Sequence, residues 1–178
     1  MHLFNTITRY GFITIFIHWL MAFIMIGMLA VGLYMVELPI GSLKLKLYGW
    51  HKAFGLLVLF LAAFRLVWRI VNMTPSLDSL PILERLAARF VHWIFYIIMF
   101  AMPLTGWLIT SAAGLPASFF GLFTMPNLIE PNEDLRLFFS SIHQFLAYGL
   151  IILIILHVSA ALKHHFINKD DILRRMIS

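Results

Sequence analysis

The stretch FFSSIHQFLAYGLIILIILHVSAALKHHF, residues 138–166, decides the fold of this chain. It is a nearly continuous apolar run with His143 and His157 inside it and with Lys163, His164 and His165 near its end. A helix that crosses the hydrocarbon core of a bilayer, roughly 30 Å thick, needs about 20 mostly apolar residues. The stretch therefore predicts a membrane-spanning helix with two histidines within its apolar part.

Three further apolar segments precede this stretch. The 178-residue chain is 62% hydrophobic and only 12% charged, whereas soluble domains carry about 25% charged residues. We therefore expect an all-α membrane protein, a single domain over residues 1–178 that folds as a four-transmembrane-helix bundle. The predicted spans are residues 12–36, 48–71, 90–113 and 138–166.

The connection between the third and fourth spans is long and aromatic. It contains Phe119-Phe120-Gly121-Leu122-Phe123, flanked by glycine and proline. We expect this loop to lie against the membrane surface and to include a short interfacial helix. The chain has no cysteine, which excludes disulfides, iron–sulfur clusters and thioether-linked haem.

The basic residues are divided unequally between the two sides of the membrane. Nine of the 13 lysines and arginines lie on the side that receives the N-terminus, the connection after the second span and the C-terminus, counting those at the adjoining ends of the spans. The positive-inside rule then predicts that both termini are cytoplasmic. Because these residues sit at helix ends and in loops, the net charge of +5 does not indicate nucleic-acid binding. Lys44, Lys46 and Lys52 form a basic group on the outer side that would attract an anionic reactant.

Four histidines within the spans fall into two pairs by depth. His143 and His157 are about 21 Å apart along one helix axis and share one helix face. His18, near the cytoplasmic side of the first span, matches His157. His51, at the outer start of the second span, matches His143. Ionisable residues inside a membrane are costly, which makes them candidates for a functional site.

Two opposed imidazoles are a standard axial ligand set for haem iron. The pattern therefore predicts two b-type haems, one between His18 and His157 and one between His51 and His143. Such ligation suits electron transfer, because it leaves no open position on the iron. A polar contact between helices is the alternative for any one histidine. Zinc fits less well, because it normally takes four clustered ligands.

Several other polar residues are candidates for contacts with haem propionates or a quinone. His92 begins the third span and is assigned either a polar contact or a propionate contact. His164 and His165 follow His157 on the same helix, and binding of a quinone, pairing with propionates and a place among the head groups all stay open. Arg9 is a lipid-phosphate anchor or a propionate partner.

The sequence resembles the bacterial cytochrome b561 family over nearly its whole length. The resemblance rests on Phe16-Ile17-His18-Trp19-Leu20, Trp50-His51-Lys52-Ala53-Phe54-Gly55, Arg65-Leu66-Val67-Trp68-Arg69, His92-Trp93-Ile94-Phe95-Tyr96, Pro103-Leu104-Thr105-Gly106 and the tail from Ala160 to Asp171. It implies a four-helix membrane bundle with two b haems. It places the axial ligands at the positions of His18, His51, His143 and His157.

The resemblance also implies a function in the bacterial inner membrane. It indicates an oxidoreductase or electron carrier that links a periplasmic donor to the ubiquinone pool, and superoxide is the first donor to test. An alternative is a haem-binding anchor subunit for a soluble dehydrogenase or hydrogenase. An alternative of another class is a histidine-lined metal-ion transporter, which a reduced-minus-oxidised visible spectrum would distinguish because it predicts a colourless protein. The sequence leaves the oligomeric state open.

Overall fold

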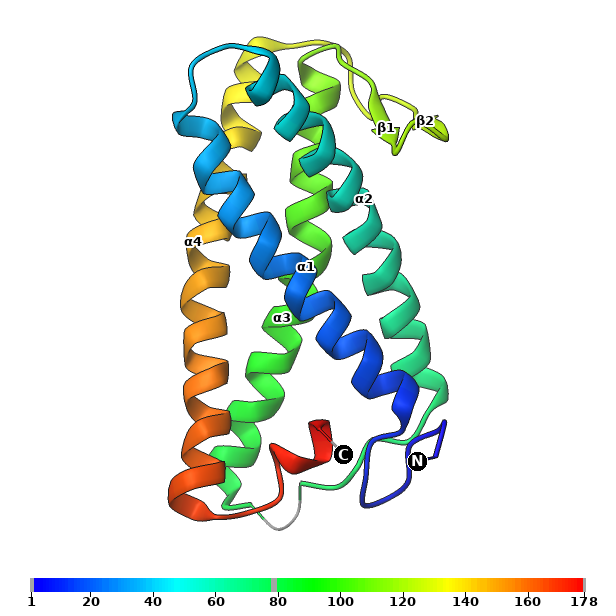
Figure 1. Cartoon of the computed structure of the whole chain (residues 1–178), viewed down its shortest axis with the longest axis vertical. Helices are drawn as coiled ribbons and strands as arrows, with labels where there is room; N and C mark the ends of the chain where they lie inside the picture. The colour runs from blue at the N-terminus through cyan, green and yellow to red at the C-terminus, as the bar shows by residue number, and fades with distance from the viewer. Residues whose placement is uncertain (1, 78–79, 178) are drawn as a thin grey trace.

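The structure is a computed structural model, and it describes residues 2–77 and 80–177. Four long helices form an elongated bundle with both termini at the same end (Figure 1). Their bounds are α1 Phe12–Glu37, α2 Ser42–Val71, α3 Ile82–Ala112 and α4 Glu133–Lys163, followed by a π-helical turn, η1 His164–Asn168, and a 3₁₀ turn, η2 Arg174–Met176.

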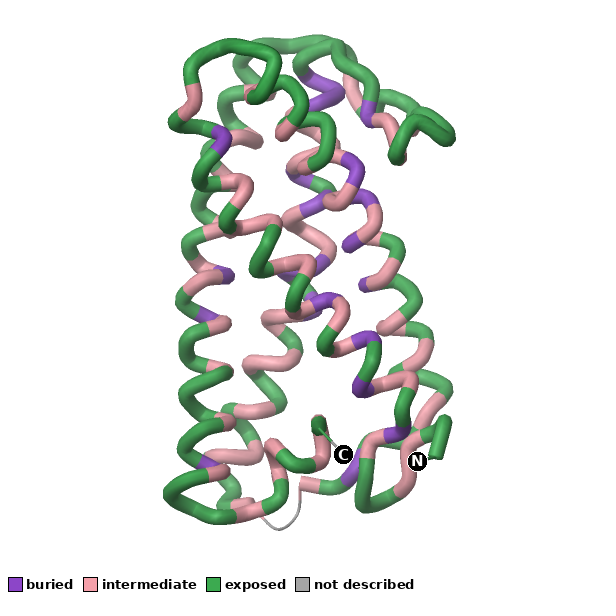
Figure 2. The backbone as a smooth tube through the Cα atoms, viewed as in Figure 1, coloured by how far each residue is buried: buried purple, intermediate pink, exposed green. Residues whose placement is uncertain are grey.

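All four helices are long and apolar enough to cross a membrane. The described part of the chain contains no other helix of which this is true. The predicted four-helix membrane bundle is therefore confirmed. Much of the outer surface of the helices is exposed in the isolated chain (Figure 2). Exposed side chains there are large and apolar, such as Phe23, Phe64 and Phe145, which is the surface that contact with lipid requires.

Three helices begin earlier than hydropathy alone predicts. The second begins at Ser42, the third at Ile82 and the fourth at Glu133. In α4 the reason is a capping interaction, because the side chain of Asn132 accepts a hydrogen bond from the backbone N–H of Leu135 at 2.9 Å. Such a cap satisfies one of the free N–H groups of a first turn. Helices α2 and α3 have no such side-chain cap, and their extra first turns contain charged residues that the apolar spans exclude.

The predicted short interfacial helix between the third and fourth spans is wrong. The structure has instead an antiparallel hairpin of β1 Ala117–Phe119 and β2 Phe123–Met125. Two consecutive positive φ angles, at Phe120 (50°) and Gly121 (77°), form a tight reversal closed by a hydrogen bond from Leu122 N to the Phe119 carbonyl. Positive φ at both central residues is typical of hairpin turns and is incompatible with a helix.

The helices pack in chain order. Helix α1 packs on α2, α2 on α3, and α3 on α4, while β1 packs on α2. Helix α1 crosses the bundle obliquely in front of the others (Figure 1). Among the described residues, α4 has no packing of comparable extent against α1 or α2. Helix α4 therefore packs mainly against α3. The side of α4 that faces α1 and α2 has few direct contacts with these helices.

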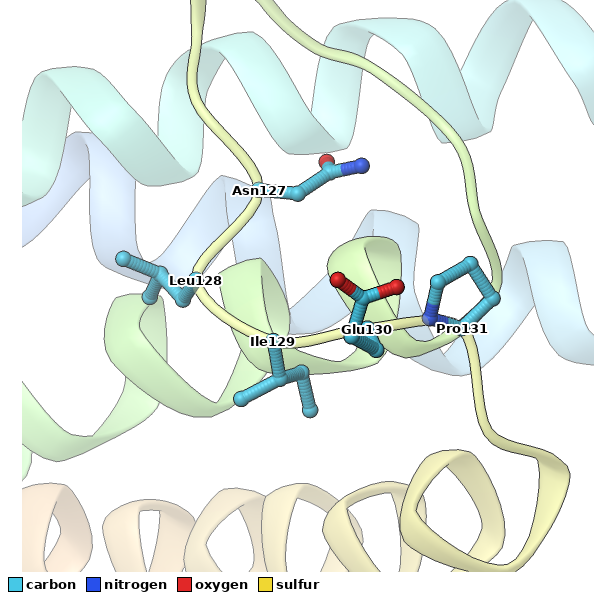
Figure 3. A pocket seen from close by; sticks show the side chains of 5 residues that line it. All are labelled: Asn127, Leu128, Ile129, Glu130 and Pro131. Carbon is cyan, nitrogen blue, oxygen red and sulfur yellow. The ribbon is translucent and has the colours of Figure 1, made fainter.

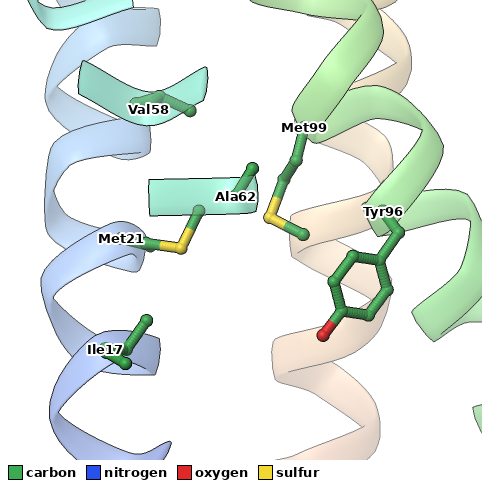
Figure 4. Packing of buried hydrophobic residues seen from close by; sticks show 6 residues of the cluster. All are labelled: Ile17, Met21, Val58, Ala62, Tyr96 and Met99. Atoms are coloured by element: carbon green, nitrogen blue, oxygen red, sulfur yellow. The ribbon is translucent and has the colours of Figure 1, made fainter. Parts of the chain in front are cut away.

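Two apolar clusters form the core. The first joins α1, α2 and α3 through Ile17, Met21, Val58, Ala62, Tyr96 and Met99 (Figure 4). The second joins α3 and α4 through Ile98, Leu150 and Leu153. Leu150 lies midway in the sequence between His143 and His157, so this second cluster places apolar packing between the two histidine levels of α4.

The C-terminal tail folds back under the bundle. After η1 the chain reverses at Lys169, which has a positive φ of 56°. The tail is then fixed by two hydrogen bonds, from Trp19 Nε1 to the Met176 carbonyl (2.7 Å) and from Arg175 to the Ser76 carbonyl (2.9 Å). These bonds connect the tail to α1 and to the segment after α2. The tail therefore covers the end of the bundle that holds both termini.

Candidate functional site

The histidine pair nearer the hairpin joins α2 to α4. The ring centroids of His51 and His143 are 6.2 Å apart, with their planes inclined at 70°. His51 stands in the third turn of α2 and His143 in the third turn of α4. The structure therefore brings together the two residues that the sequence pairs at this depth, and both rings are partly buried.

The second pair joins α1 to α4 near the end that holds the termini. The ring centroids of His18 and His157 are also 6.2 Å apart, with the planes inclined at 54°. Phe95 packs edge-on against His157 at 5.2 Å. The same helix α4 thus supplies one histidine to each pair, and the helices that supply the partners do not pack extensively against it.

The spacing within each pair fits an iron between two opposed imidazoles. A metal–imidazole bond is about 2 Å long, which puts the ring centre about 3 Å from the metal. Two rings on opposite sides of one iron then have centres about 6 Å apart, and both observed separations match. The described residues contain no group of three or more His, Cys, Asp or Glu placed to hold a metal ion. Two side-chain ligands per site suit an iron whose other ligands come from a porphyrin.

Close contacts with neighbouring helices hold the rings of the pair near the hairpin. A Cβ added at Gly32 would lie 3.2 Å from Cε1 of His51, and one at Gly106 would lie 3.4 Å from Cε1 of His143. The hydroxyl of Thr105 lies 2.9 Å from Nδ1 of His143. The sequence analysis assigned no role to these three residues, because their contacts depend on how α1 and α3 are rotated toward the histidines.

Basic residues surround the other pair. Arg65 Nη2 lies 3.2 Å from Nδ1 of His18, and the ring centroid of His92 is 6.1 Å from that of His157. A guanidinium group can only donate hydrogen bonds. In this arrangement the ring proton of His18 is therefore on Nε2, so binding of a metal at Nε2 requires Arg65 to release Nδ1.

A cavity of about 270 Å³ lies beside His92. It is lined by Tyr10, Arg69, Arg89, His92 and the segment 74–77. Burial raises the pKa of the Tyr10 phenol above its ordinary value, so this hydroxyl is neutral and can donate a hydrogen bond. Two guanidinium groups, a histidine and a phenol are a lining that suits carboxylate groups.

The remaining predicted contacts lie elsewhere. Arg9 is exposed and does not line the cavity beside His92. His164 is buried and faces carboxylates with both nitrogens, at 2.6 Å from Asp170 and 3.6 Å from Glu84. His165 packs edge-on against Phe166. The structure therefore groups His92 with the paired histidines, whereas it places His164 and His165 beyond the end of α4.

A second hollow, of about 310 Å³, lies in the loop that leads from the hairpin to α4. Its lining comes from one short segment, Asn127, Leu128, Ile129, Glu130 and Pro131 (Figure 3). Four of these five residues are exposed. No histidine of either pair lines it, so we interpret this hollow as a depression in the loop surface and not as a binding site.

The four apolar helices and the two pairs of facing imidazoles define a class, namely a four-helix membrane protein whose paired histidines come from different helices. Comparison with known proteins gives the family: residues 9–178 match the sequence profile described as prokaryotic cytochrome b561. The chain belongs to this family, whose members bind b-type haem and transfer electrons in membranes.

Several relatives match over nearly their whole lengths. The chain is 39% identical to cytochrome b561 homolog 2 of Escherichia coli K12, covering 97% of this chain and 93% of the relative. It is 30% identical to cytochrome b561 homolog 1 of the same organism, over 95% and 97%. It is also 30% identical to a probable superoxide oxidase, CybB, of Yersinia pestis, over 95% and 96%.

Proposed function

We propose that the protein is a dihaem cytochrome b that carries electrons across the bacterial inner membrane. The observation that supports this most strongly is the pair of equal separations, 6.2 Å between His51 and His143 and 6.2 Å between His18 and His157. When bound, each haem would supply a centre that accepts and releases one electron. The four histidines hold these centres at two depths, about 21 Å apart along α4.

The protein's own residues give the two sites different surroundings. The site near the hairpin is enclosed by glycine contacts and by Thr105, and has no arginine among the contacts described above. The site near the termini has Arg65 at its histidine and the cavity of Arg69, Arg89 and His92 nearby. We assign that cavity to the propionates of the second haem. Arg65 then has a carboxylate to pair with when it releases His18.

The orientation follows from the distribution of charge. Nine of the 13 basic residues lie in the terminal segments or in the adjoining ends of α2, α3 and α4, and both termini lie at one end of the bundle (Figure 1). We assign this end to the cytoplasm. The hairpin, the loop before α4 and the His51–His143 pair then face the periplasm.

Superoxide is the periplasmic donor that we propose, with ubiquinone as the acceptor. One support is the relative described as a probable superoxide oxidase. Another is the basic group near the hairpin. Lys44 donates to the carbonyls of Val36 and Leu38, and Lys52 donates to the carbonyl of Pro116. These contacts leave the charge of both lysines intact, and Lys46 is exposed. An anion would therefore be drawn toward the His51 end of the bundle.

Stopped-flow mixing tests this assignment. Purified protein in detergent with ubiquinone is mixed with superoxide, and haem absorbance is followed. We expect rapid haem reduction, followed by reoxidation that depends on the quinone concentration. Haem that stays oxidised would exclude superoxide as the donor. The anchor-subunit function would then gain support if a soluble oxidoreductase copurifies and reduces the haem.

A further inference from the structure

Thr105 gives one nitrogen of His143 a defined partner. Its hydroxyl oxygen lies 2.9 Å from His143 Nδ1 and 2.8 Å from the carbonyl oxygens of both Ala101 and Met102. A threonine hydroxyl has one hydrogen and two lone pairs. Because a carbonyl can only accept, the hydroxyl hydrogen is directed to the carbonyls. With its hydrogen on a carbonyl, the hydroxyl oxygen is left to accept a hydrogen bond from His143 Nδ1–H.

This contact favours one tautomer of His143. A neutral imidazole carries one proton, so a proton on Nδ1 leaves the lone pair on Nε2 free to bind a metal. Thr105 is only 8% exposed, and water therefore does not compete for the bond. His51 differs, because its Nδ1 is buried without a hydrogen-bond partner among the described residues. The hydroxyl thus acts on one of the two rings at this site.

We propose that Thr105 is a positioning residue that fixes the metal-binding tautomer and orientation of His143 and thereby lowers the midpoint potential of the haem near the hairpin. This inference rests on the proposed function, in which His143 would hold the iron of one haem. A hydrogen bond accepted from the far nitrogen makes an imidazole a more basic ligand. A more basic ligand stabilises ferric iron more than ferrous iron, because the ferric ion has the greater charge.

Three substitutions separate this role from simple packing. Thr105→Val keeps the shape of the side chain and removes the hydroxyl, whereas Thr105→Ser keeps the hydroxyl. Thr110→Val is the matched control. Thr110 lies on the same helix, is 7% exposed, and donates the same kind of bond to a carbonyl four residues earlier, at 2.9 Å from Gly106 O, but it has no described contact with a histidine.

The readout is an optical redox titration of the purified proteins, together with the haem content. For Thr105→Val we expect one of the two midpoint potentials to rise while the other is unchanged, or the haem near the hairpin to bind about 10–100-fold more weakly, as for other partners of metal ligands. Thr105→Ser and Thr110→Val should titrate like the unmodified protein.

Two results would overturn the inference. One is a Thr105→Val protein with the haem content and both potentials of the unmodified chain. The other is a Thr105→Ser or Thr110→Val protein that shows the same change as Thr105→Val. Failure of the proposed function is distinguishable from both, because the unmodified protein would then contain fewer than two haems or would keep both after His143→Ala.

Discussion

At the scale of single residues, two glycines allow the helices to approach the histidine rings near the hairpin. Gly32 on α1 faces His51, and Gly106 on α3 faces His143. At the separations given above, an added methyl group would crowd each ring. Glycine within a helix costs about 0.5–1 kcal/mol relative to alanine. At these two positions the close contact with a ring offsets that cost.

Gly32→Ala tests this close contact. We expect the methyl group to displace His51 and to lower the content of the haem near the hairpin, with an overpacking cost of about 1–3 kcal/mol. Gly27→Ala is the matched control on the same helix, since a Cβ there meets nothing within 4 Å. Haem absorbance per mole of protein is the measurement. Equal haem content in the two variants would show that the contact at Gly32 is not restrictive.

Arg65 provides a second test at this scale. A cation beside His18 disfavours the ferric state of a haem held there, since the ferric ion carries the greater charge. We therefore expect Arg65→Gln to lower the midpoint potential of one haem. Arg136→Gln is the control, because Arg136 pairs with Glu133 in the first turn of α4, at the other end of the bundle. An unchanged midpoint potential in Arg65→Gln would show that the charge of Arg65 does not affect the haem.

The pairing of the histidines could be predicted from residue spacing, but the residues that contact them could not. The separation of His143 and His157 fixes a shared helix face, and chain direction fixes the depth of His18 and His51. The contacts of Thr105, Gly32 and Arg65 depend instead on the rotation of α1, α2 and α3 about their axes. No hydropathy pattern in the sequence specifies those rotations.

At the scale of elements, α4 and the tail that follows it have different roles: α4 supplies the histidines, and the tail covers one end of the bundle. The apolar length of α4 carries one histidine of each pair, and η1 then reverses the chain so that the tail covers the end of the bundle. His164 fixes this reversal, because it pairs with Asp170 at 2.6 Å. Its neighbour Lys163 pairs with Glu84 on α3 at 2.8 Å.

Asp170→Ala should release the tail, whereas Asp171→Ala should not. The partner of Asp170 is the buried His164, and a buried polar group that loses a hydrogen-bond partner is costly. Asp171 pairs with Arg175 on the surface, where ion pairs contribute about 0–1 kcal/mol. Hydrogen–deuterium exchange of residues 169–177 is the measurement, with the haem content as a check on the bundle. Equal exchange in the two variants would contradict this role for His164.

The Asp171–Arg175 pair predicts a small acid dependence of the tail. The hydrogen bond from Arg175 holds the pKa of the Asp171 carboxyl below its ordinary value. The pair therefore stabilises the folded tail above that ordinary value, and the contribution disappears as the pH falls through the lowered pKa. In the Asp171→Ala protein, this part of the acid dependence of tail exchange should be absent. An unchanged acid dependence would assign it to other groups.

The hairpin shows where the sequence-based prediction of elements fails. The aromatic composition of the loop that follows the third span predicts an interfacial helix. The deciding feature is local, namely the positive φ angles at Phe120 and Gly121. Stacking of Phe119 on Phe123, at 5.0 Å between centroids, then favours the paired strands. Gly121 is the available signal, whereas positive φ at a phenylalanine is not predictable from sequence.

At the scale of the whole molecule, the four spans follow from composition because a bilayer admits few backbone structures. Orientation stays a prediction from the distribution of basic residues. The proposed periplasmic face carries Lys44, Lys46 and Lys52, so the reaction with superoxide should slow as ionic strength rises. Stopped-flow rate constants measured over a series of salt concentrations test this. A rate constant independent of salt concentration would show that these lysines do not attract superoxide to the site.

The most direct test of the account is the haem-to-protein ratio of the purified chain, measured together with its His143→Ala and His157→Ala variants. We predict two haems per chain in the unmodified protein. Each substitution should remove one haem and leave the reduced-minus-oxidised spectrum of the other, and the double variant should be colourless. A ratio of one or zero in the unmodified protein, or loss of the same haem in both single variants, would contradict the two-site arrangement.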